Sequence, residues 1–143
     1  DGVKVRPKLV MDDKPPVKET LNISKQHLRL VREGMIDVVN HPKGTAKVAR
    51  VNIDGQKIAG KTGTVQVRRV SMKEREEGER KDLTWKEKNH ALFVAYGPID
   101  KPKYAVSVVV EHGESGGAVA GPIARKIFEE CLKLDPCSPK ENS

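Results

Sequence analysis

The chain has 143 residues, enough for one domain or for part of one. Charged residues make up 33% of it and the net charge is +7, which indicates a solvated basic surface and leaves anionic partners open. No apolar run is long enough to cross a bilayer, and DGVKVRPKLV at the start lacks the apolar segment of a signal peptide. The missing initiator Met favours a fragment of a longer protein.

Residues 1–22 are rich in Lys and Pro, which favours short extended pieces at Val3–Val5 and Lys8–Met11 over a helix. A helix is expected to begin at Ser24, whose hydroxyl can cap a free backbone N–H, and to end at Asn40-His41-Pro42. Its apolar face is predicted from helical spacing and comprises Leu28, Val31, Met35, Val38 and Val39.

The stretch AKVARVNI, residues 46–53, alternates in polarity and predicts a strand through Val48, Val51 and Ile53. Asp54-Gly55 is a strong signal for a two-residue turn. A second strand is expected to run from Ile58 to Val67, so the two would form a hairpin.

Residues 68–89 are highly charged and have no periodic apolar face, which indicates a functional or disordered loop with one short helical turn at MKERE. Within it, Trp85 is expected to pack the loop against the domain, with contact to a partner as the alternative. HALFVAYGPI and YAVSVVVEHG then predict two antiparallel strands joined around Pro102. His90 and His112 lie at strand ends, where hydrogen-bonded histidines are common, and neither is assigned a role.

The last helix is expected to start near Gly121-Pro122, because Pro suits the first helical position, and to stop at Pro136. One predicted apolar stripe comprises Ile123, Ile127, Cys131 and Leu134, with Ala124, Phe128 and Leu132 beside it. Residues 136–143 are expected to be a disordered tail.

Cys131 is expected to be a buried structural thiol, whereas Cys137 lies in the tail. A disulfide between them stays open, since sequence alone cannot establish one. Neither belongs to a C-x-x-C pair and no His cluster lies near them in sequence, so no metal site and no cofactor is expected. The element order predicts an α+β fold, an antiparallel sheet covered by helices.

Two catalytic patterns overlap in GQKIAGKTGTVQV. The phosphate loop G-x-x-x-x-G-K-[ST] is satisfied by Gly55, Gly60, Lys61 and Thr62. That loop needs a helix after the Lys-Thr pair, to hold a phosphate on its N-terminal amides. Here glycine and β-branched residues follow, so nucleotide binding is rejected.

The second pattern, K-T-G-T at residues 61–64, needs a strand, and the sequence supplies one. Lys61 can present an ammonium group to a carboxylate. Thr62 and Thr64 lie at alternate positions, hence on one side of the strand. Gly63 leaves the backbone open, so that an extended peptide could pair with it or a backbone N–H could stabilise an oxyanion.

IAGKTGTVQV, then HALFVAYGPIDKPKYAVSVVVEHG, then GGAVAGPIARKIFEECL resemble the end of a class B penicillin-binding protein. More narrowly, they resemble the elongation-type penicillin-binding protein 2 group. LNISKQHLRLVREGMIDVVNHPKGTA resembles the segment before the K-T-G strand in that family, and the likeness runs from Asp1 to about Asp135. Residues 1–135 would then be the C-terminal half of a transpeptidase domain of the serine β-lactamase-like type.

The resemblance implies a peptidoglycan D,D-transpeptidase. In that family a serine attacks a D-Ala-D-Ala stem peptide, and β-lactams trap the serine. Lys61 and Thr62 match the positions for carboxylate recognition and the proton network. Thr64 matches the position whose N–H joins the oxyanion hole, and Gly63 the glycine that admits substrate. These four residues are therefore the candidate catalytic and substrate-binding set.

The chain departs from the family pattern because it contains neither S-x-x-K nor S-x-N. None of its serines has Lys three residues later: Ser24, Ser71, Ser107, Ser115, Ser138 and Ser143. The family has these motifs upstream, so the piece is expected to be inactive alone and to need the upstream half as its partner. A sheet strand would come from that half, so an exposed edge and self-association are expected.

In the family, the parent protein works at the periplasmic face of the bacterial inner membrane, and no nucleic acid partner is expected. The alternative is a non-catalytic basic module that binds an anionic partner through the charged loop 68–89, with a steep dependence on salt.

Overall fold

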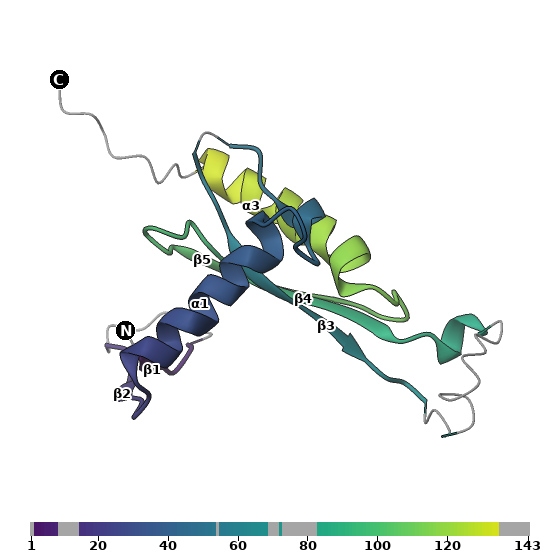
Figure 1. The fold of residues 1–143 in the computed structure, drawn as a ribbon, viewed down its shortest axis with the longest axis horizontal. Coiled ribbons are helices and arrows are strands. Elements are labelled where there is room, and N and C mark those ends of the chain that lie inside the picture. The colour runs from purple at the N-terminus through teal and green to yellow at the C-terminus, as the bar shows by residue number, and fades with distance from the viewer. Residues whose placement is uncertain (1, 9–14, 54, 69–71, 73–82, 135–143) are drawn as a thin grey trace. The chain divides into compact units, whose positions relative to one another are not determined.

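The computed structural model describes residues 2–8, 15–53, 55–68, 72 and 83–134. It divides into two compact units, Asp1–Gly34 and Met35–Ser143, which are treated separately below. Figure 1 labels their helices and strands in chain order. None of the described helices is long and apolar enough to cross a membrane.

The first unit contains a small antiparallel pair of strands, β1 (Val3–Val5) and β2 (Lys18–Thr20). The side chains of Lys4 and Glu19 form an exposed ion pair of 3.3 Å across it. The extended piece predicted at Val3–Val5 is confirmed, whereas most of the one predicted at Lys8–Met11 falls outside the described residues.

Helix α1 spans Lys25–Asn40, as the capping and proline signals predicted. The backbone N–H of His27 donates to Ser24 Oγ at 3.2 Å, so Ser24 is the N-terminal cap. Of the predicted apolar face, Val39 is fully buried, but Val31 is 62% exposed, and its inclusion was wrong. The helix contributes to the core of the second unit through its last turn.

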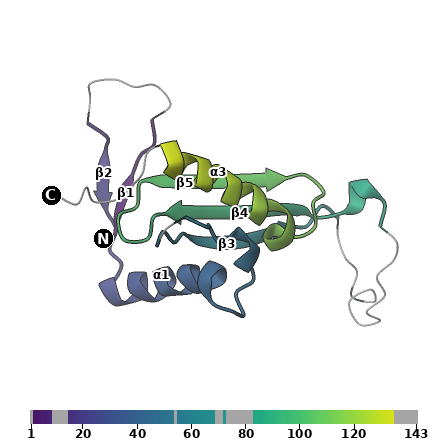
Figure 2. The same ribbon diagram turned by 90° about the horizontal axis from the view of Figure 1, so that it is seen from above.

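The second unit is built on a three-stranded antiparallel sheet in the order β3-β4-β5, with bounds Ala59–Val65, His90–Gly97 and Tyr104–Val110. Figure 2 shows the three strands side by side, with β4 in the middle. The predicted hairpin of HALFVAYGPI and YAVSVVVEHG is confirmed as β4 and β5. Thr62, Phe93 and Val108 align across the three strands.

The predicted strand at residues 46–53 is wrong. The chain forms a 3₁₀ turn, η1 (Lys47–Ala49), and then continues without pairing. Ala46 and Ala49, three residues apart, are the fully buried residues there, while Val48 is 46% exposed. The turn at Asp54-Gly55 keeps its closing bond from Gln56 N–H to Ile53 O, and Gly55 has a φ of +66°, although Asp54 itself is not described.

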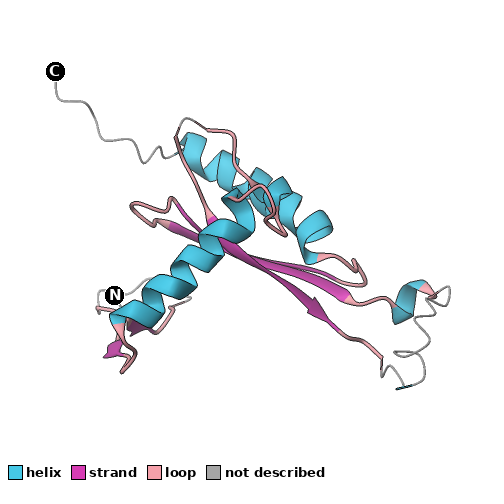
Figure 3. Ribbon diagram, viewed as in Figure 1, coloured by secondary structure: helices cyan, strands magenta, loops and turns pink. Residues whose placement is uncertain are grey.

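The core lies on one face of the sheet, between the strands, η3 (Gly116–Ala120) and α3 (Gly121–Leu134). Figure 3 shows α3 as a cyan helix above the magenta strands. Phe93 from β4 and Phe128 from α3 are the largest fully buried side chains. The buried stripe of α3 is the one with Ala124, Phe128 and Leu132. The stripe predicted as the main apolar one is more exposed, since Ile123 and Ile127 are 42% and 40% exposed.

Most of the charged segment 68–89 lies outside the described residues, including all of MKERE except Met72. Its described end forms η2 (Trp85–Glu87), whose first turn is closed by a capping box between Thr84, the N-cap, and Glu87. Residues 136–143, predicted to be a disordered tail, and Cys137 also lie outside the described part. Cys131 is half-buried on α3 rather than fully buried.

Candidate active site on the K-T-G strand

Residues Lys61, Thr62, Gly63 and Thr64 all lie in β3, in extended conformation. β3 is an outer strand of its sheet, because β4 is its sole hydrogen-bonded neighbour among the described strands. The residues after Thr62 continue the strand to Val65, so no helix N-terminus is available to hold a phosphate. The rejection of the phosphate loop is thus confirmed by the local fold.

The two faces of the sheet carry different parts of the motif. Thr62 and Thr64 align with Phe93 and Ala91 on the covered face, which we define as the face packed against η3 and α3. Their common side was predicted from strand alternation.

Lys61 and Gly63 align with Val94 and Leu92 on the opposite, open face. Val94 and Val109 on that face are 45% and 60% exposed. A ligand that meets both Lys61 and a threonine hydroxyl must therefore lie along the free edge of β3.

Lys61 is exposed, and its Nζ donates to the backbone oxygen of Thr62 at 2.7 Å. No carboxylate of the described residues pairs with it. An ammonium group has three N–H donors, so two stay available to an anionic ligand. The side chain can therefore recognise a carboxylate without first breaking an ion pair.

Gly63 keeps the open face flat at the centre of the motif. A Cβ at this position would lie 3.2 Å from the Cβ of Leu92, its partner across the strands. That distance is tighter than ordinary van der Waals contact, so a side chain here would crowd the strand pair. The glycine thus leaves the backbone accessible beside Lys61.

His90 and His112, near the ends of two strands, form a structural cluster with Trp85. His90 Nδ1 accepts a bond from the backbone N–H of His112 at 2.9 Å, and His112 Nδ1 lies 2.9 Å from Lys88 O. Because a carbonyl oxygen only accepts, His112 Nδ1 must carry a proton. The rings of Trp85 and His112 lie 4.3 Å apart, so Trp85 contacts the domain through this ring, although its side chain is 61% exposed. No group of possible metal ligands occurs among the described residues.

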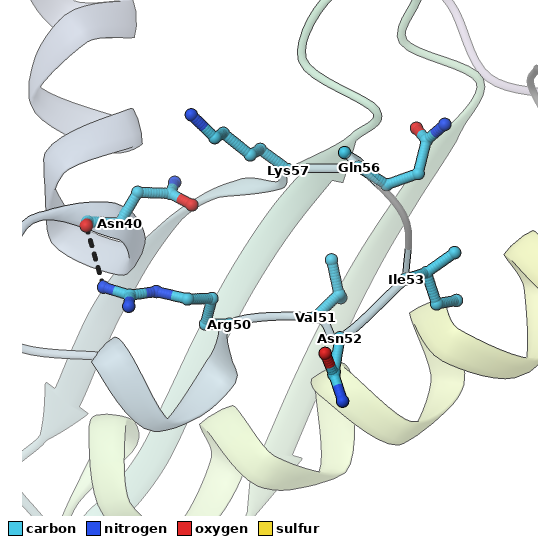
Figure 4. A pocket seen from close by; sticks show the side chains of 8 residues that line it. Asn40, Arg50, Val51, Asn52, Ile53, Gln56 and Lys57 are labelled. Atoms are coloured by element: carbon cyan, nitrogen blue, oxygen red, sulfur yellow. Dashed lines mark hydrogen bonds between the residues drawn. The ribbon is translucent and has the colours of Figure 1, made fainter.

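A hollow lies at the start of β3, away from the motif. It is an open pocket of about 430 Å³, and none of its lining residues belongs to the K-T-G-T stretch. Figure 4 shows the Arg50 side chain directed at Asn40, whose backbone oxygen accepts from Arg50 Nη2 at 2.7 Å. Arg50 therefore gives a hydrogen-bond donor to a backbone oxygen at the C-terminal end of α1. The side-chain amide of Asn40 donates to Ile36 O in α1 and to Ile58 O just before β3. These bonds connect the end of α1 to the start of β3, so the residues around the hollow have a structural role.

An antiparallel sheet with K-T-G-T on an outer strand and a C-terminal helix across one face is the arrangement expected of a penicillin-binding transpeptidase. The family model for the penicillin binding protein transpeptidase domain matches residues 1–129, and the chain belongs to that family. The predicted α+β class is confirmed by this match and by the structural neighbours. Nothing in the comparisons supports the alternative of a non-catalytic basic module.

The relatives point more narrowly to the MrdA type. The chain is 39% identical over 101 residues to the peptidoglycan D,D-transpeptidase MrdA of Haemophilus influenzae, covering 71% of this chain and 15% of the relative. It is 34% identical over 131 residues to MrdA of Acinetobacter baumannii, covering 87% of this chain and 18% of the relative.

Two solved structures give the same result. The complex between penicillin-binding protein PBP2 and MreC from Helicobacter pylori is 30% identical with a TM-score of 0.65, over 87% of this chain and 20% of that one. Pseudomonas aeruginosa PBP2 in complex with WCK 5153 is 30% identical with a TM-score of 0.62, over 92% of this chain and 25% of that one. The chain spans a quarter or less of the length of these four relatives.

Proposed function

We propose that this chain is the C-terminal half of a peptidoglycan D,D-transpeptidase domain and supplies the K-T-G wall of its active site. The observation that carries the proposal is the placement of Lys61–Thr64 on the free edge of β3, in a chain of the transpeptidase family. The substrate is a stem peptide ending in D-Ala-D-Ala. The enzyme acts at the periplasmic face of the inner membrane, held there by parts of the protein outside this chain.

The reaction is a serine acyl transfer in two steps. A serine from the upstream half attacks the carbonyl between the two D-Ala residues, the C–N bond breaks, and the terminal D-Ala leaves with a proton on its nitrogen. An amine of a neighbouring stem then attacks the ester and releases the serine. A β-lactam takes the donor's place in the first step and stays attached.

The motif residues hold the donor and stabilise the developing charge. Lys61 offers an ammonium free of any carboxylate among the described residues, which suits the terminal carboxylate and the proton network around the serine. Thr62 and Thr64 add hydroxyls, and the N–H of Thr64 faces the oxyanion in the reacting complex. Gly63 lets the extended peptide approach the strand edge.

The chain alone forms no acyl-enzyme under this proposal, because it contains no S-x-x-K serine. The test is labelling with fluorescent penicillin, followed by denaturing gel electrophoresis. We expect no labelled band from the isolated chain and a stable one from the whole protein that contains it. Labelling of the isolated chain would refute the claim that it lacks the nucleophile. A whole protein that stays unlabelled would refute the transpeptidase assignment.

In the whole protein, Lys61→Ala is expected to slow acylation by about 100-fold or more, the usual effect of removing one group that stabilises the transition state. Lys101→Ala is the matched control, because Lys101 is an exposed lysine in the turn between β4 and β5. Equal acylation rates for the two variants would show that Lys61 takes no part in the reaction.

A further inference from the structure

Two consecutive glycines lie directly against the K-T-G strand, on the covered face of the sheet. Gly116 and Gly117 begin η3, and both are buried. A Cβ on Gly116 would lie 2.3 Å from Leu92 O, 2.6 Å from Gly63 O and 3.1 Å from Gly63 N. The backbone of η3 therefore rests on the backbone of β3 and β4 at the point where Gly63 and Leu92 pair.

The second glycine makes an equally close approach to the segment that follows α1 and an ordinary contact with the motif strand. A Cβ on Gly117 would lie 2.3 Å from Thr45 O and 3.5 Å from Thr62 Cγ2. The methyl group of Thr62 thus faces Gly117. Gly117 fills the narrow space between the motif strand and the segment that follows α1.

The alternation of side chains along β3 explains why η3 can approach its backbone so closely. A side chain on Gly63 would point to the open face, where Leu92 Cβ lies, so the strand backbone is bare on the covered face at that residue. The glycines of η3 occupy that bare spot. Among the described glycines only Gly2 and Gly55 have positive φ, so Gly116 and Gly117 are required for closeness and not for backbone conformation.

The turn that carries the glycines is itself held firmly. Ser115 Oγ accepts from Ala118 N at 3.2 Å, and Ser115 O accepts from Val119 N at 2.9 Å. The helix that continues from the turn is anchored in the core by Ala124 and Phe128, both fully buried. A rigid support of this kind can fix the position of a strand whose other edge is unpaired.

We propose that Gly116 and Gly117 are positioning residues for the transpeptidase reaction, which set the place of Thr62 and Gly63 relative to the serine of the upstream half. This inference rests on the proposed function. Ordinary van der Waals contact begins at 3.4 Å, so a methyl on Gly116, 2.3 Å from Leu92 O, must drive the Gly63–Leu92 pair and the turn apart by about 1 Å. A displacement of that size at a reacting centre costs on the order of 100-fold in rate.

The experiment compares acylation of the whole protein by a fluorescent penicillin in three variants at a temperature where all are folded. Gly116→Ala and Gly117→Ala test the support. Gly97→Ala is the control for a clash away from the motif: its Cβ would lie 2.6 Å from a side-chain methyl, Ile58 Cγ2, at the end of β4 beyond the Gly63–Leu92 pair.

We expect all three variants to melt earlier than the wild type. We expect the two η3 variants to acylate about 10- to 100-fold more slowly, with the loss in the acylation rate constant and not in the affinity of the first complex. Gly97→Ala should retain the wild-type rate constant. If Gly116→Ala does not fold, Gly117→Ala carries the test, since its one backbone clash is with Thr45 O, and relieving it moves the new methyl toward Thr62 Cγ2, 3.5 Å away.

Wild-type acylation in both η3 variants would overturn this inference and leave the proposed function intact. An equal loss in Gly97→Ala would also overturn it, because the effect would then be one of general stability. A wild-type protein that is not acylated at all would instead overturn the proposed function, and this inference with it.

Discussion

At the scale of single residues, strand alternation explains much of the site. The sequence predicted that Thr62 and Thr64 share one side of a strand, and their alignment with Phe93 and Ala91 confirms it. The close approach of Gly116 to Gly63 could not be predicted, because it depends on how two segments distant in sequence pack together. Its one signal in the sequence is a pair of glycines just before an apolar helix.

Tyr96 is the residue whose substitution should stabilise the fold. Its hydroxyl oxygen is buried and has no hydrogen-bond partner within the described part of the chain. An unpaired buried hydroxyl costs about 1–3 kcal/mol, so Tyr96→Phe is expected to raise the free energy of unfolding by about 1 kcal/mol. Urea denaturation measures the change. Tyr104→Phe is the control, since it removes no buried unpaired oxygen, and a clear loss of stability in Tyr96→Phe would contradict the expectation.

At the scale of elements, α3 is tied to the segment before β3 by one carboxylate. Glu129 Oε1 accepts from Arg125 Nε at 2.8 Å and from the backbone N–H of Asn52 at 3.0 Å. The hydrogen bond from Arg125 lowers the pKa of Glu129, against the effect of burial, and the bond from Asn52 lowers it further. The ionised carboxylate is therefore the form that the fold favours.

A lowered pKa in the folded state means a contribution to stability that is present above the unfolded pKa of about 4.3 and is lost as the pH falls through the folded value. Melting temperatures of the wild type should therefore drop more steeply between about pH 5 and pH 3 than those of Glu129→Gln. Glu130→Gln is the matched control, because among the described residues Glu130 pairs on the surface with Lys133 alone. Parallel curves for wild type and Glu129→Gln would exclude the effect.

Two elements were predicted incorrectly, for a common reason. In residues 46–53 the β-branched residues suggested a strand, but none of the described strands pairs with them, and the small residues Ala46 and Ala49 are buried instead. In α3 two adjacent stripes are both apolar, and the one with Ala124 and Phe128 packs inward. Periodicity identifies apolar faces, but the neighbouring elements decide which of them is covered.

At the scale of the whole molecule, the free edges of β3 and β5 and the open face between them favour self-association of the isolated chain. We expect its sedimentation coefficient to rise with concentration. Val109→Lys places a charge on the open face and should shift the chain toward monomer. Leu134→Lys, at an 85% exposed position on the last residue of α3, should leave the association unchanged. A monomer at every concentration would contradict the prediction.

The connections between the strands also set an order of assembly. Residues 98–103 join β4 to β5, whereas β3 reaches β4 only across residues 66–89. Closing the longer connection costs more entropy, so we expect the local hairpin to form first and β3 to be added to it last. By the same reasoning we expect β3 to be the first strand to detach during a partial opening. In the whole protein, heat or denaturant should therefore abolish the chemistry proposed for the motif while most of the hydrophobic core is still intact.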